Sequence, residues 1–233
     1  MNKLRLKFLY CAAAVALIAA ACYLGKEAAA RVMGQNVKGE SGLCVMVDAG
    51  HGGMDPGKVG INGALEKDIN LEIAEALKRY LEAEGIRVVM TRESDEGLYD
   101  ANASNKKVQD MKRRVELIDE VKPVITVSIH QNSYPEEYVH GAQVFFYSGS
   151  REGQRLAEII QAQLVEKVDP ENRRKVKAND SYYLLKKTGL PIVIVECGFL
   201  SNSAEAEKLS DEDYQERLAW AVHMGIMQYL NNK

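Results

Sequence analysis

The nine residues VITVSIHQN, at positions 124–132, join an apolar run to a polar end. Residues 124–129 are dominated by Val and Ile, which favour a buried β-strand. His130, Gln131 and Asn132 follow this strand directly. In sheets covered by helices, sites form beyond the carboxyl ends of parallel strands. The segment therefore predicts a central strand with one wall of a site at its end.

Two other segments place polar residues at the end of an apolar run. Residues 43–47 precede DAGHGG (48–53), and residues 192–195 precede Glu196. Glu66 joins this group because it lies at the entry to the first predicted helix. Burying carboxylates and imidazoles beside apolar strands is costly unless they are paired or bind a metal. We therefore expect a compensating partner where these side chains meet.

The segments between the strands have the period of amphipathic helices. Helices are predicted within residues 69–84, 108–118, 156–164 and 214–226, and further strands at 86–90 and 142–147. No internal repeat is visible. The alternation predicts an α/β fold, with a single domain whose mixed, mostly parallel sheet of about five or six strands is covered by helices on both faces.

Composition limits the class of protein and its partners. The 233 residues are 46% hydrophobic and 27% charged, which is typical of a globular chain and excludes a disordered or collagen-like one. The net charge of −3 provides no basic surface for a phosphate backbone, so we expect no nucleic-acid partner. Four cysteines are too few for a disulfide scaffold.

The amino terminus departs from this average composition. Lys3, Arg5 and Lys7 precede an uncharged run at residues 8–25, which is the layout of an export signal. The run is also long enough to span a bilayer as a helix. Residues 1–25 are therefore predicted to be a cleaved signal peptide or a retained membrane anchor, and both remain open. Either one places the rest of the chain outside the cytoplasm.

A polar segment separates this terminus from the predicted domain. Residues 26–42 contain three glycines and several charged side chains, which is typical of a linker. The folded domain is expected to occupy residues 43–233.

A divalent metal is the simplest compensator for the polar residues at the strand ends. Two imidazoles, His51 and His130, and the carboxylate of Glu66 would leave one tetrahedral position for water, as in catalytic zinc sites. A further carboxylate must then take the proton of that water and pass it to the leaving amine. Glu196 fits this role, and a buried salt-bridge residue is the alternative. The spacing of the three ligands is by itself a weak signal.

Four strings carry a resemblance to a known family. DAGHGGMDPGKVG, EKDINLEIA, SIHQNS and VECGFLSN resemble the zinc-dependent N-acetylmuramoyl-L-alanine amidases of peptidoglycan, over about residues 45–229. The resemblance implies that His51, Glu66 and His130 bind zinc and that Glu196 is catalytic. Arg114 matches a recurrent family position, with a role that is more structural than catalytic. Asn132 and Arg114 are the candidate substrate contacts.

Other features are more similar to one subgroup. HGAQVFFY (140–147), YLLK (183–186) and the lack of added wall-binding repeats resemble the germination-specific amidase of endospore formers. This implies removal of the peptide from muramic acid, so that a deacetylase can form the muramic δ-lactam of spore cortex. Ala49 and Ile118-Asp119 depart from the family pattern without touching a ligand.

Alternatives stay open beside this hypothesis. They are a vegetative amidase of wall turnover or cell separation, a zinc carboxypeptidase, and a peptidoglycan-binding module without turnover. The need for an activating protein partner is also open. The phosphate-loop pattern at residues 52–58 is rejected, because Val59 lacks the hydroxyl that would hold magnesium.

Four residues near the motifs have simpler interpretations. His140 is predicted to lie on the surface or the rim, and His223 to pack within the closing helix. Cys44 and Cys197 are expected in or beside buried strands, where a free cysteine behaves as a small hydrophobe. A disulfide between them is the alternative in an exported protein.

Overall fold

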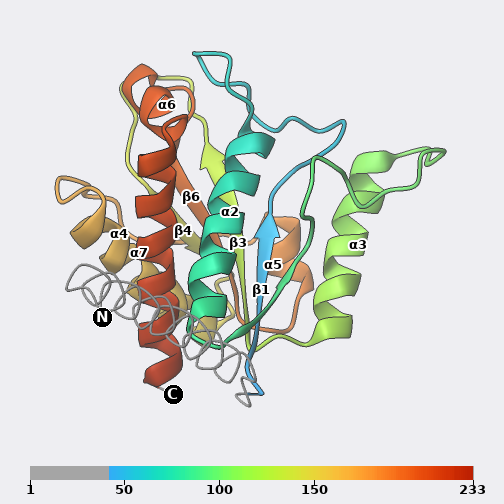
Figure 1. Ribbon diagram of the computed structural model, residues 1–233. Coiled ribbons are helices and arrows are strands. Elements are labelled where there is room, and N and C mark those ends of the chain that lie inside the picture. The colour runs from blue at the N-terminus through green and yellow to red at the C-terminus, as the bar shows by residue number, and fades with distance from the viewer. Residues whose placement is uncertain (1–41, 233) are drawn as a thin grey trace, which may run out of the picture. The chain divides into compact units, whose positions relative to one another are not determined.

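The computed structural model describes residues 42–232, which form one six-stranded sheet with helices on both faces (Figure 1). The strand order is β2-β1-β3-β6-β4-β5. The strands are β1 (Cys44–Ala49), β2 (Arg87–Met90), β3 (Ile125–Asn132), β4 (Gln143–Phe146), β5 (Lys177–Ala178) and β6 (Ile192–Phe199). β1, β2, β3 and β6 are parallel, whereas β4 runs antiparallel to β6 and parallel to β5. The predicted α/β fold is confirmed.

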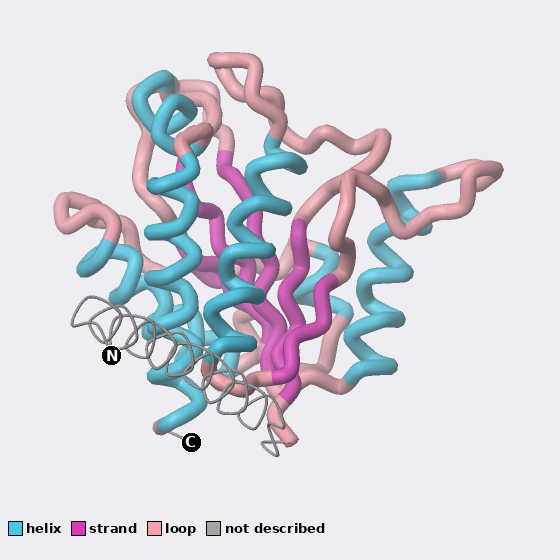
Figure 2. The backbone as a smooth tube through the Cα atoms, in the orientation of Figure 1, coloured by secondary structure: helices cyan, strands magenta, loops and turns pink. Residues whose placement is uncertain are grey.

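The helices divide between the two faces of the sheet (Figure 2). They are α2 (Glu66–Ala83), α3 (Lys106–Val121), α4 (Arg151–Lys167), α5 (Tyr183–Lys187), α6 (Ser203–Leu209) and α7 (Glu212–Asn231). On one face of the sheet, α2, α4 and α7 pack against the larger apolar core. On the other face, α3 and α5 cover a smaller core. No helix in this part of the chain is long and apolar enough to cross a membrane.

The central strands are apolar because both of their faces are covered. Every residue of β1 and β6 is buried, as expected for parallel strands between two layers of helices. β4 pairs with β6 in the opposite direction, so Gln143 lies beside Glu196. Glu196 of β6 therefore has a paired residue on each side, His130 in β3 and Gln143 in β4.

Side chains at the helix ends set where several helices begin and stop. Asn105, Ser150 and Asp211 each accept a hydrogen bond from the backbone N–H three residues later. α3 ends where Lys122 adopts a left-handed conformation with φ of 50°, and Pro123 cannot continue the helix. These local signals explain why the predicted long helices are found close to their expected positions.

Three short elements were not predicted. α5, α6 and the two-residue β5 lack enough residues to display a period, and tertiary contacts decide them. The expected signal or anchor at residues 1–25, and the linker up to residue 41, lie outside the described residues and stay predictions. Cys44 and Cys197 are both buried and free, so the disulfide alternative is wrong.

A buried ion pair joins the strands to α3. Asp48, at the end of β1, is fully buried and accepts hydrogen bonds from Arg114 of α3, Ser128 of β3 and Thr91. Burial by itself would raise the pKa of Asp48, but Arg114, the His130 imidazole and the two hydroxyl groups outweigh it and lower the pKa to about 2. The charged carboxylate is therefore part of the folded state.

Replacing Arg114 with methionine should leave the Asp48 charge buried without its cation. We expect Arg114→Met to lower the free energy of unfolding by about 3–5 kcal/mol, measured by urea denaturation at pH 7. Because the folded pKa of Asp48 lies below its unfolded value, its contribution is full above about pH 4 and is lost as the pH falls through about 2. The variant should raise this pKa and move acid unfolding to higher pH.

Arg113→Met is the matched control. Arg113 lies on the same helix, is about half exposed and forms an ion pair with Glu116 at 3.6 Å. It should change stability by less than about 0.5 kcal/mol. Equal losses for the two variants would contradict a special role for the buried pair.

Candidate active site and metal centre

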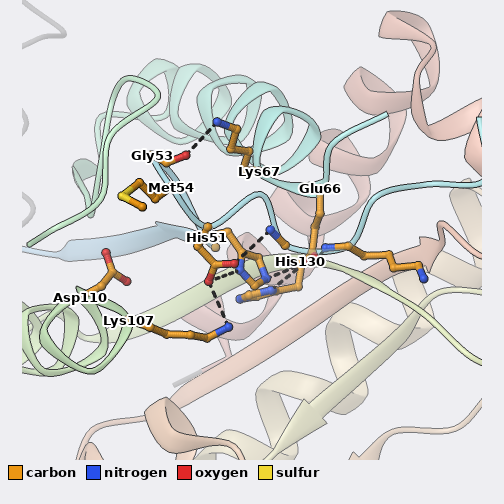
Figure 3. A network of polar contacts seen from close by, with 12 residues as sticks. His51, Gly53, Met54, Glu66, Lys67, Lys107, Asp110 and His130 are labelled. Atoms are coloured by element: carbon orange, nitrogen blue, oxygen red, sulfur yellow. Dashed lines mark hydrogen bonds and ion pairs between the residues drawn. The ribbon is translucent and has the colours of Figure 1, made fainter. Parts of the chain in front are cut away.

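The predicted site residues meet in one cavity at the carboxyl ends of β1, β3 and β6. The cavity has a volume of about 440 Å³ and is bordered by α3 and by the segment that enters α5. His51, Glu66, His130 and Glu196 all line it, as do Asn132 and Arg114. Figure 3 shows His51, Glu66 and His130 converging, with Lys107 of α3 pointing toward them. The structure thus brings together all six residues singled out in the sequence.

Glu66 is the centre of this group. It is the first residue of α2 and is only 4% exposed. Its Oε1 lies 3.2 Å from His51 Nε2 and 2.9 Å from His130 Nδ1. The backbone N–H of Lys58 donates to Oε2 at 2.7 Å, and that of Gln131 donates to Oε1 at 3.1 Å. The carboxylate is therefore fixed by the backbone on both sides.

His51 is held in a conformation that costs energy. Its φ is 62°, in the left-handed region that non-glycine residues rarely adopt. Its Nδ1 lies 3.0 Å from Asp55 Oδ2, which leaves Nε2 facing Glu66. Lys107 pairs with the same Asp55 oxygen at 3.2 Å. Strained residues held by their surroundings are frequent at functional sites.

The backbone passes unusually close to His130. A Cβ added at Gly50 would lie 2.3 Å from the His130 ring, so only glycine fits at this position. Asn70, one turn into α2, donates to the Gly50 carbonyl at 3.1 Å and accepts from the Gln131 side chain at 3.1 Å. These contacts join α2 to β3 directly behind the candidate ligands.

The three residues fit a divalent metal ion. One ligand atom from each of His51, Glu66 and His130 can be chosen so that all lie within 4.8 Å of one another. Burial would raise the pKa of Glu66, but the two imidazoles outweigh it and lower the pKa below its usual range. An ionised carboxylate between two imidazoles is the donor set of metal centres that keep a position open for water.

Glu196 lies beside this set, and no Lys or Arg of residues 42–232 forms an ion pair with it. It is paired in register with His130 in the ladder between β3 and β6, and it is 6% exposed. Burial raises its pKa to about 7, with the nearby Glu66 charge acting in the same direction and His130 against it. Its Oε2 is buried and has no hydrogen-bond partner among the described residues. Glu196 itself lines the cavity, in which a water molecule or a substrate can meet its carboxylate.

The two candidate substrate contacts differ in their surroundings. Asn132 is half-buried at the end of β3 and lines the cavity. Arg114 is 1% exposed and donates to Asp48, to Asp110 and to the carbonyl oxygens of Ala49 and His51. Substrate binding by either residue stays a prediction, but the contacts of Arg114 also give it a structural function.

Sequence reasoning missed three residues of the site. Asp55 lies four residues after His51 and Asn70 lies four residues after Glu66, so spacing could have indicated both. Tyr182, whose hydroxyl lies 3.4 Å from Glu196 Oε1, could not be found in this way because chain folding alone brings it there. His140 is exposed and His223 is buried, and neither belongs to the metal-ligating group.

The fold and the site together define a class of protein. It is the class of α/β enzymes that place two histidines and a carboxylate around a candidate metal position, with a second carboxylate beside it. The chain belongs to the N-acetylmuramoyl-L-alanine amidase family, whose model matches residues 45–228. It is a peptidoglycan hydrolase of that activity, as the resemblance implied.

Known relatives agree with this assignment. The chain is 37% identical over 196 residues to the germination-specific N-acetylmuramoyl-L-alanine amidase of Bacillus subtilis, covering 83% of this chain and 82% of that protein. It is similar to the structure of the CwlD amidase from Clostridioides difficile in complex with the GerS lipoprotein, with a TM-score of 0.80 and 40% identity, covering 82% of this chain and all of that one. It also resembles the catalytic domain of CwlV from Bacillus (Paenibacillus) polymyxa, with a TM-score of 0.70 and 30% identity, covering 82% of this chain and 99% of that one.

The contact between Asp55 and His51 should matter for metal binding. Asp55→Asn weakens the acceptor that orients the His51 ring, so we expect the affinity for Zn²⁺ or Co²⁺ to fall by about 10- to 100-fold. Titration against a chromogenic chelator measures this change.

Lys107→Met is the control for this experiment. It removes the ion pair between Asp55 and a lysine side chain that is 71% exposed, and it leaves the contacts of Asp55 with His51 and with the Gly57 N–H in place. Metal affinity should stay within about threefold of the wild type. If Asp55→Asn binds metal as tightly as this control, the orienting contact is not needed.

Proposed function

We propose that the protein is a zinc-dependent amidase that cleaves the bond between the lactyl group of N-acetylmuramic acid and L-alanine. His51, Glu66 and His130 would hold the zinc ion, and Glu196 would move the proton. The observation that carries this proposal is the free, buried Oε2 of Glu196 beside three side chains that can share one metal ion. The family membership supports the choice of bond.

The donor set agrees with zinc, which takes imidazole and carboxylate ligands in tetrahedral sites. When bound, zinc would polarise the amide carbonyl and lower the pKa of water at the fourth position. The cavity and its ionised Glu66 support this choice of ion.

Glu196 would first accept a proton and later donate it. Its carboxylate takes a proton from the attacking water, whose oxygen joins the lactyl carbonyl carbon. The carbon–nitrogen bond then breaks, and Glu196 gives the proton to the departing alanine nitrogen. The products are a lactyl carboxylate and a peptide with a free amino group. Asn132, at the cavity wall, is our proposed contact for the substrate.

We further propose a site of action outside the cytoplasm. Peptidoglycan lies beyond the membrane, and the basic and apolar residues of positions 1–25 have the layout of an export signal or an anchor. Attachment through residues 8–25, a linker at 26–42 and a catalytic domain at 43–233 complete this arrangement. A protein partner that activates the enzyme is part of the proposal, and the lipoprotein bound to the C. difficile relative supports it.

Spore cortex is the proposed substrate within peptidoglycan. The similarity to a relative named as germination-specific supports this choice. Removal of the stem peptide would leave muramic acid ready for a deacetylase and for formation of the muramic δ-lactam. A vegetative amidase of wall turnover is the second candidate, supported by 30% identity over 191 residues to LytC of B. subtilis, although the chain matches only 36% of that protein.

Replacing Glu196 with glutamine should abolish proton transfer and leave the fold intact. We expect Glu196→Gln to reduce peptide release by about 10²- to 10⁴-fold while the protein still binds stoichiometric zinc. The measurement is mass spectrometry of muropeptides after digestion by the purified protein, and a bare lactyl carboxylate identifies an amidase. Glu136→Gln, in the exposed loop after β3, is the control and should be fully active.

Other results of the same digestion would reject the proposal. A shortened stem that remains attached to muramic acid would identify a carboxypeptidase. Zinc binding without release from any wall substrate would identify a binding module. Full activity of Glu196→Gln would show that another group moves the proton.

Spore cortex and vegetative wall can be compared directly as substrates. We expect the zinc-loaded protein, with its partner where one is required, to release peptides from cortex peptidoglycan at least about tenfold faster, which is a difference of about 1.4 kcal/mol in the barrier. Product analysis of the two digestions side by side gives the rates. Equal or inverted rates would favour the vegetative alternative.

A further inference from the structure

Tyr182 lies at the edge of the cavity, on a different segment from the candidate metal ligands. It is the residue before α5 and is half-buried. Its hydroxyl donates to Glu196 Oε1 at 3.4 Å, and its ring lies against Phe145 of β4, with 5.5 Å between ring centroids. Tyr182 therefore approaches Glu196 from the side of β4.

The backbone at Tyr182 is fixed by a local turn. The Asn179 side-chain oxygen accepts hydrogen bonds from the backbone N–H of Ser181 at 2.8 Å and of Tyr182 at 2.9 Å. The Tyr182 carbonyl accepts from the N–H of Lys186 in α5 at 3.1 Å. The ring and the backbone of Tyr182 are both held by these contacts. The hydroxyl is therefore already in place beside Glu196, and no flexible segment has to become ordered first.

The two oxygens of Glu196 have different surroundings. Tyr182 donates to Oε1, whereas Oε2 is buried without a partner. No Lys or Arg forms an ion pair with Glu196 in residues 42–232, and Tyr182 is the side chain that donates to it there. Burial, followed by the Glu196 charge, raises the pKa of Tyr182 to about 12, so the hydroxyl keeps its proton at neutral pH and remains a donor.

We propose that Tyr182 is a positioning residue that holds Oε1 of Glu196 and so fixes the orientation of the carboxylate, which takes the proton from water and returns it to the leaving nitrogen. The inference rests on the proposed role of Glu196 as proton acceptor. The Tyr182 proton stays on its own oxygen throughout, and the transferred proton comes from the attacking water.

Tyr182→Phe tests this role because it removes the hydroxyl and keeps the ring that packs on Phe145. With a soluble muramoyl peptide as substrate, we expect kcat to fall roughly tenfold and KM to stay unchanged, as for loss of one hydrogen bond to a charged group. Bound zinc per chain and the thermal midpoint should match the wild type. Tyr138→Phe is the control, since this tyrosine is exposed and is not among the residues that line the cavity, and it should keep full kcat.

Comparison with Glu196→Gln separates failure of this inference from failure of the proposed function. If Glu196→Gln is inactive and Tyr182→Phe retains full kcat, Tyr182 does not position Glu196 and the proposed function stands. If Glu196→Gln is fully active, the proposed role of Glu196 in the function fails, and the positioning role that rests on it fails too. In the double variant Tyr182→Phe should add no further loss, because the residual reaction no longer uses Glu196. An additive loss, or a loss of zinc or of thermal stability in Tyr182→Phe, would overturn the positioning role.

Discussion

The buried guanidinium of Arg114 is the constraint on which the site depends. It neutralises Asp48 at the end of β1 and donates to the carbonyl oxygens of Ala49 and His51. Asp110, one turn earlier on α3, holds the same guanidinium from the other side. One side chain therefore fixes the path of the chain where it leaves the sheet. The left-handed conformation of His51 is maintained by this bonding and by its own contact with Asp55.

Glu66 makes the corresponding connection on the other side of the cavity. Its carboxylate is bonded to the backbone of the loop before α2 and to the backbone of β3, so it belongs to the fold as much as to the site. Asn70 extends the link to Gly50 and Gln131. The imidazoles therefore meet a carboxylate whose position is set by backbone donors. Such preorganisation reduces the rearrangement that metal binding requires.

The sequence predicts every strand but β5, and it predicts that His51, His130 and Glu196 meet because parallel strands place their carboxyl ends on one edge. VITVSIHQN and the apolar run before Glu196 form neighbouring strands, and His130 and Glu196 are paired in register. Contacts that depend on chain reversal were not predictable in this way. Tyr182 is 14 residues from Glu196 in a polar connection without a period, and it reaches the site only because β4 runs antiparallel and α5 folds back. The hydrogen bonds of Arg114 likewise require α3 to lie against the end of β1.

The two outer strands of the sheet have a consequence for behaviour at high concentration. β2 has four residues and β5 has two, and each begins with a basic side chain, Arg87 or Lys177. Short, charged edges offer few free backbone groups to a strand from another molecule. An apolar sheet with buried central strands is thereby protected from edge-to-edge association. Molecules crowded together on an insoluble polymer can therefore remain separate folded units rather than nucleate an aggregate.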